Sequence, residues 1–282
     1  IYDLDSTGAT FDRIITVTDG YNSTSDVGDI LLTDNYLFVG VHYARVAGSS
    51  NYHSTEAQGH VEVFDINTGS KIRRVEGFGK KRNFGQIIVE DPDTGKIYVM
   101  ESTAANQPNY DPKMHVYNSD MSVKETDFNL DISQSTNSYD TGNRYKIYNG
   151  KFYICGTDRD ETAGSYSGIQ VYDLSTNTLE TRLWSPVRTR STNWGHTFQI
   201  DPNTGVLAVS EYDGYSTGSL DVGDYVFYGR TYHFYDLNDL SLLGTIDPVD
   251  IMNQGLVHNS NLNNPSSTPQ QYPYISPDYI GS

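Results

Sequence analysis

The chain has a single cysteine, Cys155, in 282 residues, so a disulfide framework within the chain and a zinc cage of cysteines are both excluded. Basic residues are also scarce: 19 Lys and Arg stand against 36 Asp and Glu, giving a formal charge of −17. Binding to nucleic acid needs clustered cations that neutralise phosphates, so nucleic acid is not an expected partner. No apolar run reaches the ~18 residues of a membrane-spanning helix, so we expect no membrane insertion.

Residue 1 is Ile rather than Met, and no secretory leader pattern follows it, so we expect a processed product or the ordered part of a longer polypeptide. The chain is rich in aromatic and turn-forming residues, with 23 Tyr, 10 Phe and 25 Gly. Together with the aliphatic residues, the tyrosines supply enough apolar surface for a folded core. The composition names no function.

An internal repeat organises the chain. The segments NFGQIIVEDPDTGKIYVME at 83–101 and NWGHTFQIDPNTGVLAVSE at 193–211 match at an offset of 110 residues, and weaker copies occupy 28–41 and 142–156. The leading glycines are spaced by 57, 57 and 53 residues: Gly28, Gly85, Gly142 and Gly195. The offset of 110 is therefore two periods of about 55 residues.

A second element alternates with the first. It occupies 1–15, 61–75, 114–128, 169–183 and 232–246, and each copy has an aromatic residue followed by Asp or Asn. Both elements place short β-rich runs on either side of turn residues such as DPDTG, DPNTG and DINTG, which is typical of hairpins. Two hairpins per period give four short antiparallel strands, the composition of a propeller blade.

The sequence therefore predicts an all-β fold, a β-propeller of five four-stranded blades in which N- and C-terminal strands close the ring and remove open sheet edges. We expect the propeller to cover 1–258, with a weak candidate for a fifth inner pair at 253–257 and closing strands or an extended tail at 259–282. The alternative is that the chain forms part of a larger ring.

These segments resemble FG-GAP and quinoprotein-like β-propeller repeats of the surface or phage-associated type. The shared features are the Phe84-Gly85 and Trp194-Gly195 starts, the apolar strand, turn and apolar strand that follow, and the hairpin at 171–179. The resemblance covers about 1–246 and implies a blade rather than an activity. Relatives with this style of repeat occur as surface and adhesion domains, including on tailed phages and marine bacteria. The calcium loop of many FG-GAP repeats, Asp-x-Asp-x-Asp-Gly, does not occur in this chain.

The connections between hairpins are long, whereas the turns inside hairpins are short, so we expect one face of the propeller to bind a ligand. Aromatic residues in or beside these connections offer flat apolar surface with a polar handle. A few basic residues cluster in the same connections, just before the repeat's Asn-aromatic-Gly. The candidate ligand-binding residues are Tyr43, Tyr110, Tyr166, Tyr212, Tyr215, Trp184, Lys81, Arg82, Arg188, Arg190 and His196.

Acidic loops suggest Ca²⁺ as the one possible cofactor, because hard oxygen ligands lie close together in sequence. The candidate ligands are Asp158, Asp160, Glu161, Asp221 and Asp224. Catalytic patterns are weak: no HExxH or G-x-S-x-G occurs, and the matched pair Glu101 and Glu211 is explained by repetition.

The leading hypothesis is a non-enzymatic module, extracellular or on a virion or cell surface, that binds a glycan or protein partner through the long-loop face. One alternative is a carbohydrate-active enzyme, a hydrolase or lyase, with paired carboxylates in the central channel. Another is a structural subunit of a surface or virion assembly. The ligand, the source and the oligomeric state do not follow from the sequence.

Overall fold

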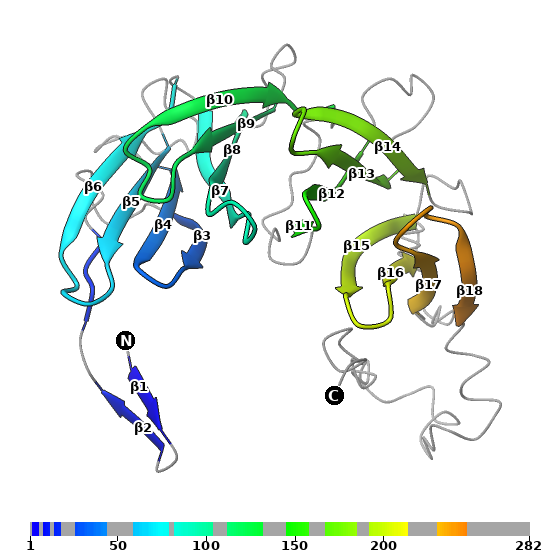
Figure 1. Ribbon diagram of the computed structural model, residues 1–282, viewed down its shortest axis with the longest axis horizontal. Helices are drawn as coiled ribbons and strands as arrows, with labels where there is room; N and C mark the ends of the chain where they lie inside the picture. The colour runs from blue at the N-terminus through cyan, green and yellow to red at the C-terminus, as the bar shows by residue number, and fades with distance from the viewer. Residues whose placement is uncertain are drawn as a thin grey trace, which may run out of the picture. The chain divides into compact units, whose positions relative to one another are not determined.

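The computed structural model describes residues 2–5, 8–11, 14–17, 26–43, 59–78, 82–103, 112–131, 145–157, 167–184, 192–213 and 230–246. Within these residues the fold is all-β, with four four-stranded antiparallel sheets and one separate hairpin (Figure 1). No helix in this part of the chain is long and apolar enough to cross a membrane.

Each four-stranded sheet takes its strands in chain order, so every sheet is one repeat. Sheet I comprises β3 (Asp26–Leu32), β4 (Tyr36–Tyr43), β5 (His60–Asp65) and β6 (Lys71–Glu76). Sheet II comprises β7 (Arg82–Glu90), β8 (Ile97–Thr103), β9 (Lys113–Tyr117) and β10 (Lys124–Asn129). Sheet III comprises β11 (Tyr145–Tyr148), β12 (Lys151–Thr157), β13 (Ser167–Asp173) and β14 (Thr178–Trp184). Sheet IV comprises β15 (Thr192–Asp201), β16 (Val206–Asp213), β17 (Arg230–Asp236) and β18 (Leu242–Ile246).

The predicted N-terminal hairpin forms from β1 (Tyr2–Asp5) and β2 (Gly8–Phe11), which pair only with each other in the described residues. Its register differs from the other hairpins of this type. Tyr2 pairs with Phe11, whereas Phe64 pairs with Lys71 and Tyr117 with Lys124. The Asp after the aromatic residue, Asp3, therefore pairs with Thr10 inside the hairpin instead of opening its turn.

The chain divides into two compact units, Ile1–Gly142 with Asp173–Thr178, and Asn143–Tyr172 with Leu179–Ser282. The first unit holds the N-terminal hairpin and sheets I and II. The second holds sheet IV and, apart from the β13–β14 turn, sheet III.

The turns predicted from Gly and Asx residues are confirmed. Gly95 and Gly205 have φ of 67° and 68°, in the left-handed region that glycine adopts at little cost. The Asp that opens each turn accepts a backbone hydrogen bond through its side chain: Asp65 Oδ1 from Thr68 N at 2.8 Å, and Asp201 Oδ1 from Asn203 N at 2.9 Å. This local chemistry fixes the hairpins independently of the sheets around them.

The leading glycine of the repeat marks an irregularity in the first strand of a sheet. In β7 the register shifts between Phe84 and Ile88, and Gly85 has φ of 85°. The backbone of Gly85 approaches sheet I so closely that a Cβ on Gly40 would lie 1.9 Å from the Gly85 carbonyl oxygen. The Phe-Gly that begins the repeat thus marks a point where the backbones of two sheets touch, and only glycine permits so close an approach.

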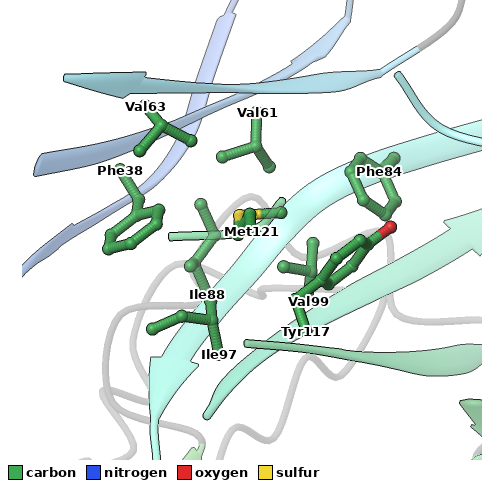
Figure 2. Packing of buried hydrophobic residues seen from close by; sticks show 9 residues of the cluster. All are labelled: Phe38, Val61, Val63, Phe84, Ile88, Ile97, Val99, Tyr117 and Met121. Atoms are coloured by element: carbon green, nitrogen blue, oxygen red, sulfur yellow. The ribbon is translucent and has the colours of Figure 1, made fainter. Parts of the chain in front are cut away.

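Sheets I and II pack face to face through buried apolar side chains. Phe38, Val61 and Val63 of sheet I lie opposite Ile88 and Val99 of sheet II, as Figure 2 shows. The remaining members of the cluster are Phe84, Ile97, Tyr117 and Met121. This interface is the core of the first unit among the described residues.

Sheets III and IV pack through the same repeat positions. Val99 and Ile97 of sheet II correspond, at the offset of 110, to Val209 and Leu207, which lie in the second unit's cluster. The full cluster contains Tyr153, Ile169, Val171, Phe198, Ile200, Leu207, Val209 and Tyr235. The repeat found in the sequence is therefore a repeat of packing as well.

Candidate functional site

The two ends of each sheet differ in the length of the chain that joins the strands. At one end, here called the short-turn end, a few residues connect β3 to β4 and β5 to β6. At the other, the long-connection end, β4 ends at Tyr43 and β5 begins only at His60. Sheets II and IV follow the same plan, with β8 ending at Thr103 and β9 beginning at Lys113, and β16 ending at Asp213 and β17 beginning at Arg230.

The predicted site residues that fall on described strands lie at this end. Tyr43 is the last residue of β4 and pairs with Asp26, and Arg82 is the first residue of β7 and pairs with Thr103. In the second unit Tyr212 pairs with Arg230 near the ends of β16 and β17. By backbone position these residues lie at the long-connection end of their sheets.

Two further predicted residues, Trp184 and His196, also lie on described strands. Trp184 ends β14, and its indole packs against Gly168, where an added Cβ would lie 2.9 Å from Cε3. Its ring is therefore partly buried. His196 lies within β15 in the irregular stretch between Trp194 and Phe198, which matches the irregular stretch of β7.

The other predicted residues lie outside the described residues. These are the ligand candidates Tyr110, Tyr166, Tyr215, Lys81, Arg188 and Arg190, and the calcium candidates Asp158, Asp160, Glu161, Asp221 and Asp224. Gly142 and the weak fifth inner pair at 253–257 also lie outside them. Among the side chains that the structure describes, no group of three His, Cys, Asp or Glu could hold a metal ion.

A buried polar residue recurs on the third strand of every sheet, two positions before the aromatic residue of the repeat. Each has a polar partner. Glu62 pairs with Lys71 at 3.0 Å, and His233 Nδ1 lies 3.2 Å from Thr245 Oγ1. The four residues are Glu62, His115, Gln170 and His233. In the sequence this position shows only as a polar residue in the middle of an apolar third strand.

In sheet II the buried histidine at this position contacts a buried carboxylate. His115 Nε2 lies 3.0 Å from Glu101 Oε2, and the two side chains are 2% and 0% exposed. The second carboxylate oxygen of Glu101 accepts a hydrogen bond from the backbone N–H of Phe78 at 3.1 Å. On its other side, His115 Nδ1 faces Asp127 Oδ2 at 3.8 Å, beyond hydrogen-bond distance.

Lysines surround Asp127 at the edge of this network. Lys124 forms an ion pair with Asp127 Oδ2, and Lys113 Nζ lies 3.5 Å from Asp127 Oδ1. The hydrogen bond from Lys124 is the largest of the effects that lower the pKa of Asp127. Burial, with smaller effects from Glu101 and Asp127, raises the pKa of Tyr117, whose hydroxyl therefore stays protonated.

Phe78 covers the pair from the connection between β6 and β7. Its ring stacks on the His115 imidazole with centroids 4.6 Å apart and planes 25° apart, and Lys124 Nζ lies 4.2 Å from the ring centroid. Half of Phe78 nevertheless remains exposed, at 52%. Sequence reasoning missed Phe78 because nothing in Gly-Phe-Gly indicates whether the ring faces the core or solvent.

The carboxylate of Glu101 is therefore committed to internal hydrogen bonds. The register does confirm the predicted equivalence of the two glutamates, because Glu101 pairs with Phe84 and Glu211 with Trp194. Glu101 is fully buried, so its carboxylate is not accessible to a substrate as a general acid or base.

No protein family model and no curated protein matches the chain. Solved structures do match, at low identity. The β-propeller domain of the Trilobed protease from Pyrococcus furiosus, described with an open velcro topology, aligns with TM-score 0.44 at 10% identity, covering 80% of this chain and 58% of that one. Europium-containing methanol dehydrogenase aligns with TM-score 0.42 at 14% identity, covering 78% of this chain and 53% of that one. Acylaminoacyl peptidase from Pyrococcus horikoshii aligns with TM-score 0.45 at 10% identity, covering 79% of this chain and 32% of that one. The chain thus spans less than two thirds of each of these structures. The resemblance to FG-GAP repeats rests on the chain's own residues.

Proposed function

We propose that the chain is a five-bladed β-propeller that acts as a non-enzymatic binding module, with the long-connection ends of its sheets meeting a glycan or protein on a cell or particle surface. One observation carries the functional part: the sheets are closed by tight Asx turns at one end and by long connections at the other. Binding groups are placed most readily on long loops held by a rigid scaffold.

The residues at the strand ends support the same face. Tyr43, Tyr212 and Arg230 lie within two residues of a long connection, and Arg82 pairs with Thr103, the last residue before one. Tyrosine and arginine bury large surfaces on binding and hydrogen-bond through their ends, which is why they dominate binding hot spots. The short-turn end instead has carboxylates engaged in their own turns, such as Asp65 and Asp201.

The five-bladed ring is supported by a face of sheet I that lacks a covering layer in the described residues. Ile30 and Ile88 hold the same place in their sheets, because they pair with Val39 and Val99. Ile88 and its counterpart Phe198 are 2% and 1% exposed, but Ile30 is 60% exposed. Val27 and Leu32 on the same strand are exposed as well. A further sheet, built from the N-terminal hairpin and residues after Ile246, would cover this face.

The binding function is tested on printed arrays of glycans and on surface proteins, with the full chain and single alanine variants of Tyr43, Arg82 and Tyr212. Asp93→Asn, an exposed change in a short turn, serves as the control. We expect the three variants to weaken binding by about tenfold or more, as hot-spot residues do, and the control to bind like wild type. Equal binding by all variants would overturn the chosen face. Turnover of a bound glycan would favour an enzyme instead.

A further inference from the structure

Phe78 is an exposed aromatic ring whose position is fixed. Its backbone N–H donates to Glu101 Oε1 at 3.1 Å, and its ring stacks on His115 at 4.6 Å. Phe84 contacts the same ring edge-on at 6.1 Å. Three contacts on one residue leave it little freedom, although 52% of its surface faces solvent.

The support beneath Phe78 is costly for the fold. Glu101 and His115 are removed from water almost completely, and desolvating ionisable groups is unfavourable unless they are well paired. Packing alone would be served as well by apolar residues at both positions. In sheet II the pair also holds a half-exposed ring, so Phe78 is ordered before a ligand arrives and the ordering cost of binding is lowered.

The rim of Phe78 holds both donors and acceptors. Lys113 and Lys124 offer ammonium donors, and Asp127 offers carboxylate oxygens, all on partly exposed side chains. The two ammonium groups are already paired with Asp127, and the whole chain carries a charge of −17. These charges disfavour an anionic ligand. Neighbouring hydroxyl groups, which donate to a carboxylate and accept from an ammonium, match this rim without bringing charge.

We propose that Phe78, Lys113, Lys124 and Asp127 form a subsite for an uncharged sugar ring. The aromatic ring receives the apolar C–H face of the sugar, after the flexible Lys124 side chain moves aside, and the Lys and Asp groups bond its hydroxyls. The subsite rests on the proposed binding function and deepens it, because it names neutral saccharides as the ligand and places them on sheet II.

The experiment measures binding of the full chain to neutral and to acidic oligosaccharides on one array, followed by calorimetric titration of the best neutral ligand. The variants are Phe78→Ala, Phe78→Trp and Asp127→Asn. Val123→Ala is the matched control, because Val123 is an exposed apolar residue just before β10 that takes no part in the proposed subsite. Thermal melting of each variant verifies that the fold is retained.

We expect Phe78→Ala and Asp127→Asn to weaken neutral-sugar binding by about tenfold or more, and Phe78→Trp and Val123→Ala to keep it. If the wild type binds neutral sugars but Phe78→Ala binds them equally well, the subsite is wrong while the binding function stands. Binding to acidic sugars alone also overturns the subsite. A chain that binds a protein and no sugar at all overturns the subsite and the glycan part of the proposed function together.

Discussion

Replacing Ile30 with alanine tests directly whether a further sheet covers the exposed face of sheet I. The equivalent residue Ile88 is 2% exposed, and truncating a buried Ile to Ala costs about 2–5 kcal/mol through lost burial and the cavity left behind. Ile30 is 60% exposed, which would limit the cost to about 0.5 kcal/mol. If a further sheet covers this face, Ile30→Ala should cost as much as Ile88→Ala.

The assay is urea unfolding of the full chain, followed by tryptophan fluorescence and far-UV circular dichroism, with the free energy of unfolding taken from the midpoint at unchanged m-value. Ile72→Ala is the control, because Ile72 is 44% exposed on a strand of the same sheet. We expect losses of about 2 kcal/mol or more for both Ile30→Ala and Ile88→Ala, and little change for the control. A loss at Ile30 no larger than at Ile72 would refute the covering sheet and with it the closed ring.

Three other predictions follow from the contacts described. Glu101→Gln leaves the buried imidazole beside it without its charged partner and should lower the free energy of unfolding by about 3 kcal/mol, measured by chemical denaturation; a loss below 1 kcal/mol would contradict the buried pair. Gly40→Ala brings a Cβ to 1.9 Å from a backbone oxygen and should cost about 3 kcal/mol, whereas Gly244→Ala, with open space around its Cβ, should melt within a few degrees of wild type. The pKa of Asp127 is lowered in the folded state, so its ion pairs stabilise the fold fully above the unfolded value of about 3.9, and this stability is lost as the pH falls through the folded value. Asp127→Asn should therefore be less stable than wild type at pH 7, and the gap should narrow as the pH is lowered; a gap of constant size across an acid titration would refute the electrostatic cause.

The sheets could be predicted from the sequence because their determinants are local. Asp, Thr and Gly in DPDTG and DPNTG fix a turn by contacts within a few residues, and Gly95 and Gly205 adopt the backbone that this chemistry requires. Alternation of apolar residues on either side of such turns then gives the strands. The period of about 55 residues correctly divided the described part of the chain into four-stranded sheets.

The candidate site could be predicted only in part. Tyr43 and Arg82 lie at the expected end of their sheets because strand polarity follows from the order of turns and connections. The pairing of Glu101 with His115 depends on the register of β8 against β9 across a connection of variable length, which no local pattern encodes. The exposure of Phe78 depends in turn on that pair, so it too required the structure.

Each unit draws its apolar core from two sheets that follow one another in the chain. During synthesis, sheet II therefore emerges when sheet I is already available to pack against, and sheet IV emerges in the same way after sheet III. The packing between the two sheets of a unit therefore joins segments that are synthesised one after the other. The uncovered face of sheet I is the exception, because its exposed Val27, Ile30 and Leu32 must wait for the last residues of the chain if the ring closes as proposed. Until then this face is the part of the nascent protein most prone to associate with other chains.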